Sequence, residues 1–286
     1  MSDAVASMDK WPGKISLLIS DVDGTLVTRQ KVVTPRSVAA VRMLGEAGIA
    51  FTVTSSRPPR GIAHLIEPLN LQLPIGGFNG GGLMQPDGSV AEALMLSPDA
   101  AHEAFRITLK HGLDPWVYTV TEWYVRDLDA PHVAREASNI TFPPHVVTDF
   151  EDALNNCGKI VAVGDDPAAV LACNAELDRV LKGQVSATRS QSYFIDITHP
   201  DANKGTMVDI MARLLSIPAS EIATIGDMAN DILMFRKSGL SIAMGNASTE
   251  VKEQAMLSTD TNEEEGFAKA VERYLLGIAP LGIGSE

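Results

Sequence analysis

The sequence predicts an α/β protein, with a doubly wound parallel sheet and a second, inserted α+β domain. Short runs rich in Ile, Val and Leu end in Asp, Ser or Gly, which is typical of buried parallel strands. Helical patterns alternate with these runs near both ends of the chain. Between them the pattern changes to aromatic, alternating stretches that favour antiparallel strands. We therefore expect a discontinuous core, residues 1–84 and 195–286, and an inserted domain over residues 85–194.

Composition argues against several kinds of partner. The chain has 286 residues and a formal net charge of -13, with a pI of about 4.9, which disfavours binding to nucleic acid or an anionic membrane surface. No apolar run is as long as a membrane span. The first residues lack the basic-then-apolar pattern of a signal peptide. Residues 1–14 and 279–286 are expected to be tails.

The two cysteines, Cys157 and Cys173, have no metal-ligand spacing and are expected to be small buried hydrophobic residues. Because nothing suggests a disulfide framework, we expect a reducing compartment and a cytoplasmic protein. The sequence leaves the oligomeric state open between a monomer and a small homo-oligomer.

The first strand delivers two carboxylates. The apolar run Ile15–Ile19 is followed, after Ser20, by Asp21-Val22-Asp23-Gly24-Thr25. Residues two apart on an extended segment point the same way, so both aspartates are expected to face one spot at the strand's carboxyl end. Ligands bind there in open α/β sheets. Two neighbouring carboxylates repel each other, and they are tolerated where a cation neutralises them or where their pKa values differ for proton transfer. An ordinary turn is the alternative.

A helix follows from Thr34-Pro35 to about Gly48, with Thr as the N-cap and Pro at the first helical position. Ile49–Ser56 is predicted to be the second strand, which gives the β-α-β beginning of a parallel sheet.

The hydroxyl of Ser55 stands between this strand and a helix predicted over residues 60–69, a favourable place to hold a phosphate. Helix capping is the alternative, for Ser56 more than for Ser55.

A third strand, Leu73–Phe78, precedes Asn79 and three glycines. A dinucleotide-binding loop needs a helix directly after such glycines. A β-hairpin with a Pro-Asp-Gly turn follows instead, so the glycines are expected to let the backbone approach a ligand or change direction. The inserted domain is predicted to hold helices over 97–111 and 167–181, and strands within 115–127, over 159–163 and within 185–197. Its His132 and Arg126 are open between substrate contacts and ordinary surface residues.

After the inserted domain, helical periodicity begins just past Asn203-Lys204-Gly205. A cation at a helix N-terminus is disfavoured by the macrodipole, so Lys204 needs an anionic partner unless it is a solvated surface residue. The strand Ile222–Ile225 then leads to Asp227, Asn230 and Asp231, oxygen ligands suited to a hard cation such as Mg²⁺. An N-cap is the alternative for one of them. A strand over 240–244 and helices over 249–256 and 266–276 complete the chain.

Taken together, five motifs resemble those of the haloacid dehalogenase-like (HAD) phosphohydrolases, in particular the Cof-type branch with a C2-type cap. They are DVDGTL, TSSRP where that branch usually has T-G-R-P, NGG, NKG and GDMANDILMF. The resemblance covers the whole chain except the tails, and implies a Rossmann-like core with the inserted domain as a cap. Ser55 and Ser56 depart from the usual Thr and Gly, but Ser55 keeps a hydroxyl.

The resemblance also implies a role for each site residue. Asp21 would be the nucleophile that forms an aspartyl-phosphate, and Asp23 the general acid and base. Ser55 and Lys204 would hold the phosphoryl oxygens. Substrate-side contacts would come from Thr25, Ser56, Arg57, Asn79 and Gly80. Mg²⁺ would be held by Asp21, the main-chain carbonyl of Asp23, Asp227, Asn230 and Asp231.

The expected function is thus a Mg²⁺-dependent phosphatase of small phosphorylated metabolites, with sugar phosphates as the expected class. A phosphomutase or phosphotransferase with the same nucleophile is the nearest alternative. A non-catalytic phosphate-binding module is another. A dinucleotide-binding oxidoreductase is the weakest.

Overall fold

The computed structural model describes residues 11 and 13–278. The predicted tails, residues 1–14 and 279–286, therefore lie outside the described residues except for residues 11, 13 and 14. The chain divides into two compact units: Met1–Thr54 with Leu65–Leu73 and Met207–Glu286, and Ser55–His64 with Pro74–Thr206. The predicted core (residues 1–84 and 195–286) and cap (residues 85–194) are roles in catalysis, which the division into compact units does not test, and they stay a prediction.

The first unit contains a parallel sheet with the strand order β14-β13-β12-β1-β2. All four neighbouring pairs are parallel, as the apolar runs predicted. β14 is the one strand of this sheet that the sequence did not predict. The strands are β1 (Leu17–Asp21), β2 (Ala50–Thr54), β12 (Ile222–Gly226), β13 (Leu240–Ala243) and β14 (Leu257–Ser258).

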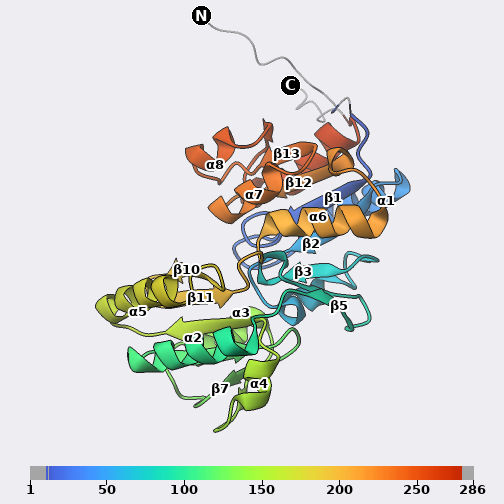
Figure 1. The fold of residues 1–286 in the computed structure, drawn as a ribbon. Helices are drawn as coiled ribbons and strands as arrows, with labels where there is room; N and C mark the ends of the chain where they lie inside the picture. The colour runs from blue at the N-terminus through green and yellow to red at the C-terminus, as the bar shows by residue number, and fades with distance from the viewer. Residues whose placement is uncertain (1–10, 12, 279–286) are drawn as a thin grey trace, which may run out of the picture. The chain divides into compact units, whose positions relative to one another are not determined.

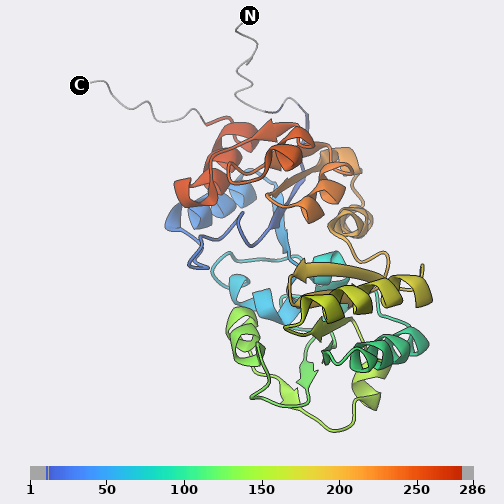
Figure 2. The same ribbon diagram turned by 90° about the vertical axis from the view of Figure 1, so that its left-hand side faces the viewer.

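Helices cover both faces of this sheet, as a doubly wound arrangement requires. Figure 2 shows α1 (Pro35–Glu46) and α9 (Gly266–Ala270) on one face, and α6 (Lys204–Leu215) on the other. The side chain of Thr34 accepts a hydrogen bond from the Ser37 N–H at 3.1 Å, which confirms the predicted N-cap. Two short helices, α7 (Ile232–Phe235) and α8 (Thr249–Glu253), complete the unit.

Two predicted helices differ from the structure. The segment predicted as a helix over residues 60–69 is a 3-10 helix over Pro59–Leu65, because Pro59 lacks an N–H and Gly61 is a poor helix former. The predicted helix over 266–276 is α9 followed by a π-helical turn, Val271–Leu275.

The second unit is mainly antiparallel, in agreement with the predicted α+β domain (Figure 1). β3 (Ile75–Gly77), β4 (Gly82–Met84) and β5 (Val90–Ala93) pair in that order. A six-stranded sheet has the order β10-β11-β9-β6-β7-β8. Its strands are β6 (Asp114–Tyr118), β7 (Trp123–Val125), β8 (His145–Val146), β9 (Lys159–Val163), β10 (Ser186–Gln191) and β11 (Phe194–Thr198).

The helices of this unit lie on the two faces of the six-stranded sheet. α2 (Pro98–Lys110) and α5 (Pro167–Val180) pack on one face around an apolar cluster that includes both cysteines, and α4 (Glu151–Asn155) joins them. Cys157 and Cys173 are fully buried, as predicted. The other face is aromatic and is covered by α3 (Val133–Ile140). The sequence did not predict α3 or α4.

Candidate active site

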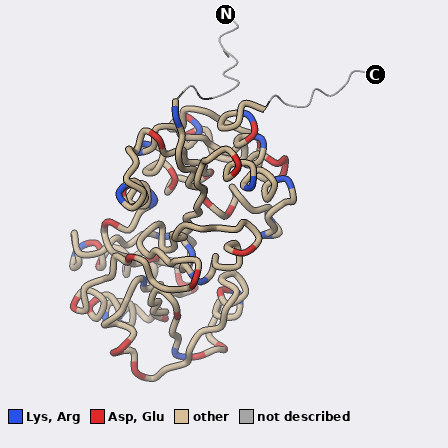
Figure 3. Tube along the Cα trace, turned by 90° about the vertical axis from the view of Figure 1, so that its right-hand side faces the viewer, with Lys and Arg blue, Asp and Glu red and all other residues tan. Residues whose placement is uncertain are grey.

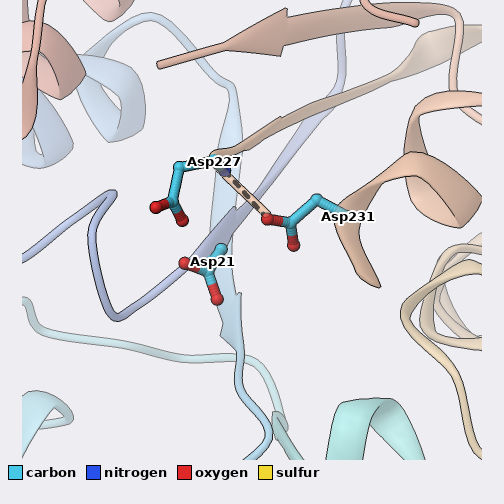
Figure 4. Close-up of side chains that lie close together, drawn as sticks. All are labelled: Asp21, Asp227 and Asp231. Atoms are coloured by element: carbon cyan, nitrogen blue, oxygen red, sulfur yellow. Dashed lines mark hydrogen bonds between the residues drawn. The ribbon is translucent and has the colours of Figure 1, made fainter. Parts of the chain in front are cut away.

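Three carboxylates meet at the carboxyl ends of β1 and β12. These strands are neighbours, and their register pairs Ser20 with Ile225. Asp21 ends β1, Asp227 follows β12, and Asp231 lies on the next turn (Figure 4). One oxygen of each carboxylate lies within 4.8 Å of the others. The sheet topology therefore brings Asp21 next to two carboxylates that lie more than 200 positions further along the sequence.

These carboxylates are also buried: Asp21 is 5% exposed, Asp227 7% and Asp231 0%. Carboxylates at so short a distance repel one another, and burial removes the water that would screen their charges. A bound cation of high charge would offset both the repulsion between the carboxylates and their loss of hydration. Because all three donors are carboxylate oxygens, the set fits a hard divalent ion.

Asp231 also fixes the turn that carries Asp227. Its Oδ2 accepts hydrogen bonds from the backbone N–H groups of Asp227 and Met228, both at 2.8 Å. Asn230 lies on the same turn, half-buried. Asp231 thus holds the loop in shape, in addition to contributing charge to the cluster.

The side chain of Asp227 is held at both of its oxygens. The hydroxyl of Thr25 donates to Oδ1 at 3.3 Å, and the amide of Asn246 donates to Oδ2 at 3.1 Å. The same Asn246 amide donates to the carbonyl of Gly24 at 2.9 Å. Gly24 has φ +84°, and a Cβ at this position would lie 2.4 Å from Asp227 Oδ2. The turn therefore requires glycine both for its backbone conformation and for space.

Asn246 is a site residue that the sequence argument missed. Its Oδ1 accepts from the Asn262 N–H at 3.0 Å, and the Asn262 side chain donates to the Val27 carbonyl at 2.9 Å. This relay ties the loop after β1 to the segment after β13. A signal was available, because Asn246 follows β13 closely and so lies at the same edge of the sheet as Asp21 and Asp227.

Asp23 has a different partner from Asp21. Its Oδ1 lies 2.6 Å from Lys31 Nζ, on a small hairpin in which Val27 bridges to Val33. We expected the side chains of Asp21 and Asp23 to point the same way, which requires an extended backbone through both residues. The strand β1 ends at Asp21, so Asp23 lies beyond it. The structure groups Asp21 with Asp227 and Asp231, and pairs Asp23 with Lys31.

The remaining predicted site residues belong to the second unit, where Ser55 is central. Ser55 is buried, its Oγ accepts from the Arg57 N–H at 3.2 Å and its carbonyl accepts from the Asn79 N–H at 2.8 Å. Ser56 is exposed. The Arg57 guanidinium donates to the carbonyl of Asn139, at the end of α3, at 2.8 Å.

Two further features mark this group of residues. Phe78 and Asn79 have positive φ, at 51° and 57°, and such strained backbone in residues other than glycine is concentrated at functional sites. Lys204 is the first residue of α6 and is only 1% exposed. The alternative of a solvated surface lysine is therefore wrong. A buried ammonium at a helix N-terminus must be compensated by anions.

The family model for haloacid dehalogenase-like hydrolases matches residues 18–271. The chain belongs to that family, as the motifs predicted, and is an enzyme of the hydrolase class. It is 29% identical to a Haemophilus influenzae protein named provisionally as a phosphatase, over 89% of this chain and 96% of that one. It is 26% identical to the 5-amino-6-(5-phospho-D-ribitylamino)uracil phosphatase YcsE of Bacillus subtilis, over 92% and 96%.

Solved structures agree with the fold. A haloacid dehalogenase-like hydrolase from Bacteroides thetaiotaomicron aligns with a TM-score of 0.84 and 27% identity, covering 91% of this chain and 99% of that one. A HAD-superfamily phosphatase from the same organism aligns with a TM-score of 0.78 and 26% identity, covering 93% and 96%.

In Figure 3 the Lys and Arg residues of the described part of the chain are interspersed with Asp and Glu residues along the trace. Over residues 11 and 13–278, no helix is both long and apolar enough to cross a membrane.

Proposed function

We propose that this chain is a Mg²⁺-dependent phosphatase that hydrolyses small phosphorylated metabolites through an aspartyl-phosphate on Asp21. The observation that carries the proposal is the buried cluster of Asp21, Asp227 and Asp231 at the edge of the parallel sheet. Names of relatives support the phosphatase activity. Bound Mg²⁺ would offset the negative charge of the nucleophile and the phosphate.

The ion would be held by the carboxylates of Asp21 and Asp227, with the main-chain carbonyl of Asp23. Asn230 and Asp231 complete this proposed set. Thr25 and Asn246 fix the Asp227 carboxylate from either side. Such supporting hydrogen bonds commonly set metal affinity.

The chemical step follows from the proposed roles. An oxygen of Asp21 attacks phosphorus, while Asp23 protonates the oxygen that leaves with the organic group. Asp23 then takes a proton from the water that attacks the phosphorus of the aspartyl-phosphate. Water releases inorganic phosphate and restores the Asp21 carboxylate. The buried Ser55 hydroxyl and the Lys204 ammonium would stabilise the charge on the phosphoryl oxygens.

Substrate-side contacts are proposed for Ser56, Arg57, Asn79 and Gly80. The backbone N–H of Phe78 donates to the Arg57 carbonyl and that of Asn79 to the Ser55 carbonyl, so the segments that carry Arg57 and Asn79 are hydrogen-bonded to each other. The inserted domain, residues 85–194, is proposed as the cap that selects the leaving group. We retain the predictions of a cytoplasmic location and of a monomer or small homo-oligomer.

The expected substrates are sugar phosphates and related phosphorylated polyols. The relative from Bacillus subtilis is named for a substrate with phosphate on a ribityl chain, which is chemically close to a sugar phosphate. This likeness favours a hydroxyl-rich leaving group over a nucleic acid or a phosphoprotein.

The test is phosphate release from sugar phosphates, nucleotides and an aryl phosphate, with and without Mg²⁺, in the wild type and in Asp21→Asn. Release that requires both Mg²⁺ and Asp21 supports the proposal. If a second sugar phosphate becomes phosphorylated, the chain is a mutase or phosphotransferase. If the folded, Mg²⁺-binding protein binds phosphate without turnover, it is a binding module.

A further inference from the structure

A hairpin over residues 28–33 follows Asp23 in the chain and brings a cation back to it. The ammonium of Lys31 donates a hydrogen bond to Asp23 Oδ1 at 2.6 Å. Both side chains are partly in contact with solvent, Lys31 at 52% exposure and Asp23 at 30%. Ion pairs that are this exposed contribute little to stability, because water screens them and two side chains lose rotamer freedom. Fold stability therefore gives little reason for this contact.

The backbone at Lys31 is strained. Lys31 has φ +62°, in the left-handed region, which residues with a Cβ adopt only at a cost. Hydrogen bonds within the hairpin hold this shape, since Lys31 N–H donates to the Thr28 carbonyl at 2.9 Å and Thr28 N–H to the Val32 carbonyl at 3.0 Å. Glycine would adopt the same conformation at lower cost. A strained lysine beside a proposed catalytic residue points to a role for its side chain.

The hairpin is also fixed to the rest of the first unit. The Val27 carbonyl, at its base, accepts from the Asn262 side chain at 2.9 Å. The main-chain N–H of Arg29 donates to Glu263 Oε1 at 2.7 Å. Asn262 also donates its main-chain N–H to Asn246 Oδ1 at 3.0 Å. The turn of the hairpin is thus held by the relay that supports the carboxylate cluster.

A general acid must present its proton in one direction. In the proposed reaction, Asp23 gives a proton to the leaving oxygen as the bond from phosphorus to that oxygen breaks and the bond from phosphorus to Asp21 forms. A partly exposed carboxyl group can rotate, and a misplaced group loses much of its catalytic effect. The hydrogen bond from Lys31 fixes Oδ1, so Oδ2 is the oxygen that exchanges the proton. The ammonium keeps its own protons throughout.

We infer that Lys31 is a positioning residue for the general acid, and that its ammonium holds the Asp23 carboxyl group in the orientation from which Oδ2 protonates the leaving group. This inference rests on the proposed function, in which Asp23 is that acid. Lys31 should therefore matter for phosphate esters whose leaving group needs a proton. It should matter little for esters whose leaving group departs as a stable anion.

The experiment compares kcat/KM for benzyl phosphate with kcat/KM for 4-nitrophenyl phosphate, both with Mg²⁺. Each leaving group is a single uncharged ring, so neither offers Lys31 a charge to bind. Benzyl alcohol leaves only with a proton, whereas 4-nitrophenolate leaves readily without one. In Lys31→Met, we expect the benzyl-to-nitrophenyl ratio to fall about 10–100-fold, a part of what general acid catalysis contributes.

Three further variants separate positioning from charge and from folding. Lys31→Arg keeps a cation and should keep most of the ratio. Lys31→Gly removes the side chain and relieves the strain at φ +62°, so it should fold at least as well as the wild type and still lose the ratio. The matched control is Arg29→Met, which removes the same charge from the same hairpin and keeps the main-chain bond to Glu263. It should leave the ratio unchanged.

The link to Asp23 is tested by combining Lys31→Met with Asp23→Asn. If Lys31 acts through Asp23, the double variant has the same ratio as Asp23→Asn alone. A further fall in the double variant overturns the inference. So does a wild-type ratio in both Lys31→Met and Lys31→Gly, or an equal fall in Arg29→Met.

Failure of the proposed function has a separate signature. A wild type that releases phosphate from neither ester overturns the proposed function and this inference together. A wild type that hydrolyses only the nitrophenyl ester has no working general acid, which overturns the inference and leaves the phosphatase activity in place.

Discussion

The side-chain amide of Asn246 donates to Asp227 Oδ2 at 3.1 Å, from a loop 19 residues further along the chain. The orientation of that amide is set by its other bonds, since Oδ1 accepts from the Asn262 N–H while Nδ2 donates to the Gly24 carbonyl. One side chain therefore ties together the turn after β1, the carboxylate after β12 and the segment after β13. We regard Asn246 as a positioning residue for the proposed metal site.

Replacing Asn246 by Ala should weaken Mg²⁺ binding. Loss of a supporting hydrogen bond to a metal ligand typically lowers metal affinity about 10–100-fold. The measurement is calorimetric titration with Mg²⁺, with Asn174→Ala as the control. Asn174 lies on α5 and donates to Asp178 within the same helix, so its loss should not change the affinity. An Asn246→Ala protein that binds Mg²⁺ as tightly as the wild type would remove Asn246 from the site.

Gly24→Ala should impair the site beyond its effect on stability. Gly24 and Gly48 both have left-handed backbone, with φ +84° and +75°, so alanine at either costs about 1 kcal/mol or more. They differ in space: a Cβ at Gly24 meets Asp227 Oδ2 at 2.4 Å, whereas at Gly48 nothing lies within 4 Å. We expect both variants to lower the free energy of unfolding measured in urea, but only Gly24→Ala to lower Mg²⁺ affinity. Equal Mg²⁺ affinities in the two variants would argue against this account.

The ionised Glu176 side chain should stabilise the second unit near neutral pH and lose this effect in acid. Hydrogen bonds from Lys110 and His111 lower the pKa of Glu176 to about 2. A depressed folded-state pKa stabilises the fold above the unfolded value of about 4.5, and this contribution is lost as pH falls toward about 2. Glu176→Gln should therefore unfold more easily than the wild type at pH 7, and the difference should shrink below pH 4. A difference that is constant from pH 7 to pH 2 would contradict the assignment.

Burial should keep both thiols unreactive in the folded protein. Burial raises the pKa of Cys173 to about 11, and raises that of Cys157 as well. Because the thiolate is the reactive form, a maleimide reagent at pH 7 should label neither residue until denaturant is added. Rapid labelling of the native protein, read by mass spectrometry, would show that the domain opens.

The parallel sheet and the carboxylates could be predicted from the sequence because both depend on local patterns. Apolar runs that end in Asp specify a strand and its tip, and neighbouring strand tips share an edge. The roles of Asn246 and Lys31 depend instead on which loops fold back onto the site, and no short pattern encodes that. The ion pair between Lys159 and Asp196 was not foreseen, because it depends on the pairing of β9 with β11 in the antiparallel sheet.

The central claim is that Asp21 carries the phosphoryl group during turnover. The most direct measurement is a single-turnover reaction with a ³²P-labelled substrate, stopped in acid and followed by peptide mapping, in the wild type and in Asp23→Asn. We predict label on the peptide that contains Asp21. With an aryl phosphate, whose leaving group needs little protonation, more label should accumulate in Asp23→Asn, because release of the phosphoryl group to water is slowed. Complete turnover with no label on that peptide, together with an active Asp21→Asn, would contradict the mechanism.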